Sequence, residues 1–208
     1  MAYAFDLKKI SLEDFKGILQ EGYLIPSQVV LREDIDEYFR ILEEDDVKNM
    51  LDLSKLIKSK KKAEDYSVQS EIPLDYLIVL RRAVSSYLPK PRKLEDYSDI
   101  DKIQLEMFKA KGCKTSKDLY ESDLVYNDRI VALMDVSRLR YVSGTFATAL
   151  VKSGYVSIAS ISQANPDQMY KDMVETNNEH HIYKGPIGRN DMVFIIEDAK
   201  LWIKYKMI

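Results

Sequence analysis

Apolar residues recur along most of the chain at the spacing of one helix face, and a glycine or short polar residue ends each run. The run after Ser11 is typical, because Leu12, Phe15 and Leu19 fall on one face and Gly22 follows them. Only 7 glycines and 6 prolines occur in 208 residues, too few for the many turns of a stranded fold. The pattern therefore predicts an all-α protein.

The segment 139–161 shows the pattern most completely. A short hairpin is expected first, and a helix is expected to follow it. Gly154 can supply the left-handed turn that ends this helix, and Ser157 can cap the next one. The apolar positions of the first helix are Phe146, Ala147, Leu150 and Val151.

The same order of residues occurs earlier in the chain. When Gly112 is aligned with Gly154, Phe108 matches Leu150 and Thr115 matches Ser157. A weaker copy runs from Leu31 through Leu42 and Val47 to Leu53. The chain is therefore expected to repeat a supersecondary unit made of a hairpin, a helix, a left-handed turn and a second helix.

Pro89-Lys-Pro91 is the expected domain boundary, because it stops the preceding helix and stiffens the connection. We expect an N-terminal helical domain over 1–90 with one degenerate copy of the unit. Over 91–208 we expect a tandem of the unit followed by C-terminal helices. The last of these carries Ile196, Leu201 and Trp202, too much apolar surface to leave in water.

Composition and charge limit the classes of partner that the protein is expected to bind. Hydrophobic residues are 46% and charged residues 31%, and no apolar run approaches the roughly 20 residues that span a bilayer. We expect a cytoplasmic protein with no membrane partner. The net charge of -3 is uneven, because the stretch from Lys58 to Lys93 holds nine basic and four acidic residues. That stretch is where an anionic partner is electrostatically favoured.

The repeated plan resembles the helix-hairpin-helix superfamily, and the tail is similar to a bacterial domain-of-unknown-function family within it, domain of unknown function 4332. The residues that carry the second resemblance are Asn165-Pro-Asp-Gln-Met-Tyr170, Asn177, Ile182-Tyr183-Lys184-Gly185, Gly188, Asn190-Asp191-Met192 and Ala199-Lys200, with Pro26-Ser27 and Tyr87-Leu-Pro-Lys-Pro91. The superfamily resemblance implies tandem helix-hairpin-helix units that bind DNA or RNA backbones without sequence preference.

The hairpins depart from the Gly-apolar-Gly pattern that brings backbone amides to a phosphate. One copy reads Asp99-Ile100-Asp101, whose carboxylates would repel an anion, and it is interpreted as a packing element. The other reads Tyr141-Val142-Ser143. Candidate phosphate contacts at this second hairpin are Ser143, Gly144, Thr145, Arg138, Arg140 and Lys152, and those in the basic stretch are Lys60, Lys61, Arg81 and Arg82. The alternative for Lys58–Lys62 is a solvated cluster at a helix carboxyl end.

No catalytic constellation is recognisable. His180 and His181 are the only histidines, without zinc-ligand spacing, and Cys113 is expected to be a small buried hydrophobe. We expect no enzyme, no metal and no cofactor. Two hypotheses remain open: weak, sequence-independent nucleic-acid binding, and a protein-interaction or scaffold module that has lost phosphate contact.

Overall fold

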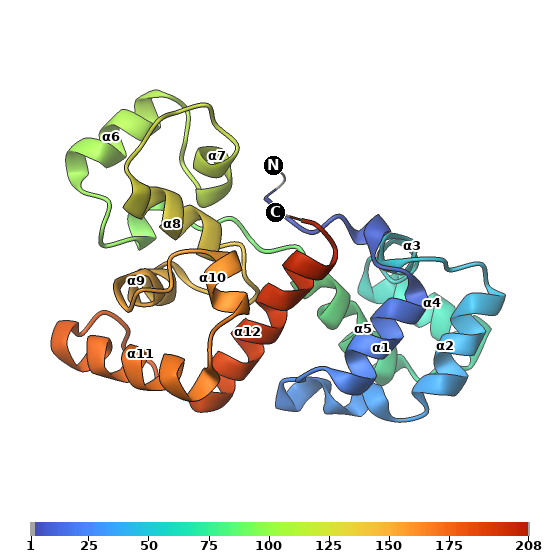
Figure 1. The fold of residues 1–208 in the computed structure, drawn as a ribbon. Coiled ribbons are helices and arrows are strands. Elements are labelled where there is room, and N and C mark those ends of the chain that lie inside the picture. Colours follow the sequence, from blue (N-terminus) through green and yellow to red (C-terminus); the bar gives the residue numbers. More distant parts are fainter. Residues whose placement is uncertain (1–2, 208) are drawn as a thin grey trace. The chain divides into compact units, whose positions relative to one another are not determined.

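A computed structural model describes residues 3–207 of the chain and divides it into two compact units. One unit holds residues 5–88, and the other holds residues 89–207 together with Tyr3 and Ala4. The predicted all-α class is confirmed, because residues 3–207 form helices and contain no β-strand (Figure 1). None of these helices is both long enough and apolar enough to traverse a lipid bilayer.

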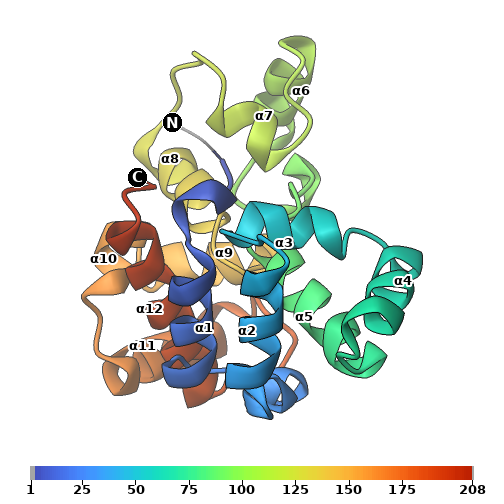
Figure 2. The ribbon, with the colours of Figure 1, turned by 90° about the vertical axis from the view of Figure 1, so that its right-hand side faces the viewer.

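The N-terminal unit packs its helices around an aromatic centre. Phe15 lies with its ring centroid 5.9 Å from that of Tyr87 and 6.2 Å from that of Phe39. Figure 2 shows α1 and α2 lying side by side around this core. The elements are the 3₁₀ turns η1 (Leu7–Lys9) and η2 (Pro26–Arg32) and the helices α1 (Leu12–Glu21), α2 (Ile35–Glu44), α3 (Met50–Leu56), α4 (Lys60–Ser70) and α5 (Leu74–Ser86).

The C-terminal unit closes around its last helix. Helix α12 packs against α10 and α11 and buries Trp202 completely. Asn165 caps α11, accepting hydrogen bonds from the amides of Asp167 and Gln168. The elements are η3 (Leu94–Asp96), α6 (Lys102–Ala110), α7 (Ser116–Tyr120), α8 (Asp128–Val136), α9 (Gly144–Lys152), α10 (Ile158–Ser162), α11 (Pro166–His180) and α12 (Arg189–Lys204).

The segments around Gly112 and Gly154 have the same local geometry. Both glycines adopt left-handed φ angles, 85° and 93°. After Gly154, the amide of Tyr155 donates to the carbonyl of Leu150 at 3.0 Å, and the amide of Cys113 donates to Phe108 at the same distance. These bonds close the ends of α9 and α6 and satisfy carbonyls that a helix end leaves without partners.

The weaker copy shares this turn without a glycine. Asp46 adopts a φ of 63°, and the amide of Val47 donates to the carbonyl of Leu42 at 3.1 Å. Aspartate tolerates this conformation better than most residues. Asn49 then caps α3, as Thr115 caps α7 and Ser157 caps α10. The local signals that end and restart a helix therefore recur three times.

The first amide of the second helix is also satisfied in each copy. In the first two copies a backbone carbonyl accepts: Ile10 accepts from Met50 at 3.0 Å, and Arg92 from Ser116 at 2.7 Å. In the third, the Oδ2 atom of Asp135 accepts from the amide of Ile158 at 2.8 Å. A side chain of α8 thus takes the place of the backbone carbonyl that accepts this bond in the other two copies.

Candidate nucleic-acid interface

The hairpin between α8 and α9 is the candidate with the best resemblance to a phosphate site. Its Tyr141 adopts a φ of 62°, a conformation that glycine accommodates readily and a bulky residue adopts at a cost of roughly 1–2 kcal/mol. The Tyr141 ring is half exposed and lies 5.4 Å from the ring of Phe194 on α12. An aromatic side chain therefore stands where a glycine would leave the backbone open to a ligand.

Ser143 and Thr145 form the start of α9. The Oγ atom of Ser143 accepts from the amide of Phe146 at 3.2 Å and lies 3.1 Å from Oγ1 of Thr145. Ser143 is thus the cap of its own helix, and its hydroxyl occupies the place at which an external anion would accept from that amide.

Gly144, the first residue of α9, is buried against η3. A Cβ atom at this position would lie 2.7 Å from the carbonyl oxygen of Asp96 and 2.9 Å from its Cβ atom. The glycine is therefore needed for close packing within the protein. The residue that it meets is an exposed aspartate, whose charge opposes the approach of a phosphate to the start of α9.

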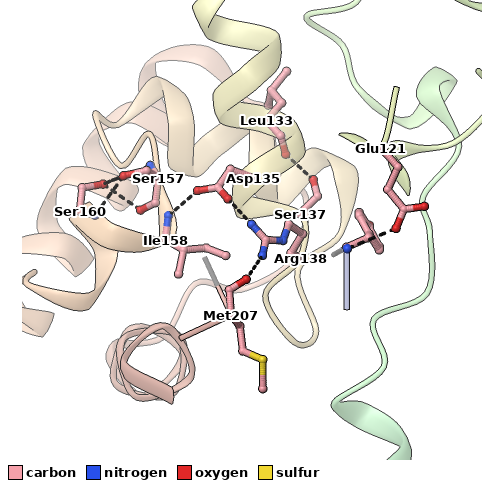
Figure 3. A network of polar contacts seen from close by, with 10 residues as sticks. Glu121, Leu133, Asp135, Ser137, Arg138, Ser157, Ile158, Ser160 and Met207 are labelled. Atoms are coloured by element: carbon pink, nitrogen blue, oxygen red, sulfur yellow. Dashed lines mark hydrogen bonds and ion pairs between the residues drawn. The ribbon is translucent and has the colours of Figure 1, made fainter. Parts of the chain in front are cut away.

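Arg138 is an internal residue, with 1% of its surface exposed. Its guanidinium carbon lies 4.5 Å from the ring centroid of Tyr120 and 4.2 Å from that of Trp202. Its Nη1 atom lies 2.6 Å from Oδ1 of Asp135, and its Nη2 atom donates to the carbonyl of Met207 at 3.1 Å. Figure 3 shows both contacts. Arg138 thus joins α7, α8 and the end of α12, and its charge is directed inward.

Arg140 is internal as well, with 7% of its surface exposed. Its Nε atom lies 2.5 Å from Oδ1 of Asp198, and its backbone amide donates to Oδ2 at 2.8 Å. The guanidinium also lies 4.8 Å from the Phe194 ring. Sequence reasoning missed Asp198, although an acidic residue within the apolar face of the last helix is a signal that it has a buried partner.

The neighbourhood of Asp135 links the repeats to each other. Asp135 bridges Arg138 and the start of α10, and Ser137 donates to the carbonyl of Leu133 at 2.6 Å (Figure 3). The hydroxyl of Tyr97 in turn donates to Ser137 at 2.7 Å. Burial raises the pKa of Tyr97 to about 12, so this phenol stays protonated and keeps donating at neutral pH.

Lys152 is the one hairpin-associated candidate cation that is exposed. It lines a shallow depression of about 460 Å³ between α8 and α9, together with Val131, Val151 and Val156. Asp128 and Arg129 also line it. Apolar side chains make up most of this lining, and Arg129 already pairs with Asp99, which is not the composition of a groove that follows a phosphate backbone.

The first hairpin uses both of its carboxylates internally. Asp99 accepts from Nε of Arg129 at 2.6 Å, and Asp101 caps α6 by accepting from the amide of Gln104 at 2.8 Å. In turn, the Oε1 atom of Gln104 accepts from the Asp101 amide at 3.2 Å. These contacts agree with the interpretation of this hairpin as a packing element.

The four candidate cations of the basic stretch lie in the N-terminal unit, whereas Lys90, Arg92 and Lys93 belong to the C-terminal unit. Lys60 and Lys61 are exposed in the first turn of α4, where Ser59 accepts from the amide of Lys62 at 3.2 Å. The alternative that placed the Lys58–Lys62 cluster at a helix carboxyl end is wrong for Lys60–Lys62, because the Ser59 cap starts a new helix there. On α5, Arg81 is partly buried and Arg82 is exposed.

The cysteine and the two histidines are the remaining residues with reactive or metal-binding side chains. Cys113 is buried as predicted, and its Sγ atom lies 3.7 Å from the carbonyl of Asp118. His180 ends α11, and His181 follows it in a left-handed turn. Over residues 3–207, no three His, Cys, Asp or Glu side chains gather in a way that could hold a metal ion.

Comparison with family models, with curated proteins and with solved structures finds no match to this chain. The resemblance to the helix-hairpin-helix superfamily and to domain of unknown function 4332 therefore rests on the sequence motifs alone.

Proposed function

We propose that this protein is a protein-interaction module. The observation that carries the proposal is the contrast within the C-terminal unit between inward-facing cations and outward-facing apolar residues. Arg138 and Arg140 are buried, whereas Ile103 and Met107 on α6 are 81% and 48% exposed. Exposed apolar residues that share one helix face are a feature of surfaces that bind other proteins.

The second hairpin supports the same proposal, because it does not have the features that a phosphate-binding hairpin needs. Binding of a phosphate backbone requires open amides and cations directed outward. Here Tyr141 covers the turn, Ser143 caps its own helix, and Gly144 packs against Asp96. A hairpin of this kind serves to hold α8 and α9 together.

The experiment is recovery of a tagged full-length chain from its native cells after treatment with DNase and RNase. A protein that remains bound in fixed stoichiometry after nuclease treatment is the expected result. Loss of all associated material on nuclease treatment, with nucleic acid released, would contradict the proposal.

Weak nucleic-acid binding is the second candidate, and one observation favours it. Three successive lysines, Lys60–Lys62, lie in the first turn of α4. Their charges add to the positive end of the helix dipole, so this end of α4 is electropositive although Lys60 lies 3.6 Å from Glu64. Binding through such a surface would be independent of base sequence and would weaken as salt rises.

A further inference from the structure

Helix α6 is the structural counterpart of α9, but it is much less covered. The two helices occupy the same position before Gly112 and Gly154, and each has nine residues. Helix α9 buries seven of its residues, whereas α6 buries only Phe108. In both views α6 lies at the edge of its unit (Figures 1 and 2).

The difference arises because two other helices, α8 and α11, pack on α9. Ser153 at the end of α9 donates to the carbonyl of Asp172 on α11 at 3.5 Å, and the Tyr155 hydroxyl donates to the Asp172 carboxylate at 2.7 Å. Ala149, one turn before Ser153 on the same face, is fully buried. Helix α11 is therefore the cover of this face of α9.

The face of α6 that carries Met107 is apolar and exposed. Met107 stands at the position of the buried Ala149. Ile103 and Ala110 lie beside it, one turn before it and just under one turn after it, at the positions of Thr145 and Lys152, which are exposed on α9. These three residues, all exposed, form a stripe that we call the α6 stripe. Its spacing is that of the anchors by which an amphipathic helix is recognised.

The charged residues at the carboxyl end of α6 indicate the charge of the partner. Lys111 stands at the position of Ser153, and Lys114 follows Cys113, which stands at the position of Tyr155. Two cations therefore lie beside the place that corresponds to the Asp172 contacts of α9. Within residues 3–207, neither lysine takes part in an ion pair, although Lys109 pairs with Glu95 at 2.5 Å. Glu106 lies on the opposite edge of the stripe. The carboxyl end of α6 therefore favours an acidic residue on whatever covers it.

We propose that the α6 stripe binds an acidic amphipathic helix of another protein, which packs on the carboxyl-terminal part of α6 as α11 does on α9. The inference rests on the proposed function and specifies the partner class and the surface. Apolar residues of the partner helix would cover Ile103 and Met107, and an Asp or Glu of that helix would pair with Lys111.

The test uses the full chain and a synthetic fluorescein-labelled peptide with the sequence 165–181. Its exposed Lys171 and Glu175 are joined by a lactam so that the isolated peptide is helical. Fluorescence polarisation is expected to show saturable binding to the wild-type chain. Ile103→Asp and Met107→Asp should each weaken it by about tenfold or more, as loss of a buried apolar anchor does. Val68→Asp, at a residue 86% exposed on α4, is the matched control and should leave binding unchanged.

A charge exchange tests the orientation. Lys111→Glu should weaken binding severalfold, and a peptide carrying Asp172→Lys should recover affinity for that variant. Absence of saturable binding by a folded chain, or equal binding by Met107→Asp, would overturn the inference. Sedimentation that shows a dimer dissociated by Ile103→Asp would also overturn it, because the stripe would then bind a second copy.

An incorrect assignment of the binding surface to α6 can be distinguished from an incorrect proposed function. If nuclease-resistant partners are still recovered with Ile103→Asp while the peptide does not bind, the interaction module stands and the assignment to α6 is wrong.

Discussion

Arg140 and Asp198 are 58 positions apart in the chain, and they form an ion pair with Nε and Oδ1 at 2.5 Å. Asp198 is completely buried and also accepts from the Arg140 backbone amide. One carboxylate therefore fixes both the side chain and the backbone of the second hairpin against α12. This explains why a cation that appeared suited to a phosphate is unavailable to one.

We expect Asp198→Ala to destabilise the protein by about 3–5 kcal/mol, because it leaves a buried guanidinium without its charge partner. Urea unfolding followed by circular dichroism measures the change. The matched control is Asp167→Ala, which removes the exposed partner of Arg189 and should change stability far less. Equal effects of the two substitutions would show that the Arg140 pair is not buried in solution.

Gly144→Ala should cost about 1–3 kcal/mol, as insertion of a methyl group into a packed contact does. Its Cβ would meet the backbone oxygen of Asp96 at 2.7 Å, and a backbone atom cannot move aside cheaply. Gly17→Ala is the control, since a Cβ there has nothing within 4 Å and lies inside α1. That substitution should stabilise the protein by roughly 0.5–1 kcal/mol. Thermal unfolding of the two variants should therefore shift in opposite directions.

Deletion of residues 190–208 should give an insoluble or molten product. The deletion removes the cover of Arg138 and the partner of Arg140, and it exposes the apolar surface that Trp202 and Ile196 bury against. Near-ultraviolet circular dichroism and binding of a hydrophobic dye are the measurements. A soluble truncation that unfolds cooperatively would refute this role of α12.

Any nucleic-acid binding should be weak and should fall steeply as salt rises, because its contacts are lysines and arginines that displace counterions. Fluorescence polarisation with short duplex and single-stranded DNA and RNA at low salt measures it. Joint replacement of Lys60, Lys61, Arg81 and Arg82 with glutamate should abolish binding if α4 and α5 carry it.

Lys152→Glu is the corresponding variant for the second hairpin, since Lys152 is exposed and can be changed without disturbing the packing of Gly144. If the hairpin does not contact phosphate, as the proposed function holds, this variant should bind DNA and RNA as weakly as the wild type does. Binding that is lost with Lys152→Glu and retained in the quadruple variant would return the hairpin to consideration as a phosphate site.

Local sequence patterns were enough to predict most of the helices and several of their ends, although the start of α4 at Lys60 was missed. Left-handed turns at Gly112 and Gly154 and caps at Thr115 and Ser157 are short-range features, since each involves bonds within about five residues. Such bonds depend on the identities of neighbouring residues, which the sequence displays directly. The all-α class and the alignment of the two segments could therefore be predicted.

Which polar residues face solvent depends on packing between elements that are distant in the sequence. Arg138 and Lys152 are both cations beside the same hairpin, yet Arg138 lies between two aromatic rings and Lys152 is exposed. The partners that bury Arg138 and Arg140 lie on α7, α8 and α12, and no local pattern specifies which distant carboxylate or ring will meet them. The exposure of Met107 likewise depends on packing. Helix α11 follows the second repeat and packs on α9, whereas after α7 the chain contacts α6 through Tyr126 and Phe108 and leaves Met107 exposed.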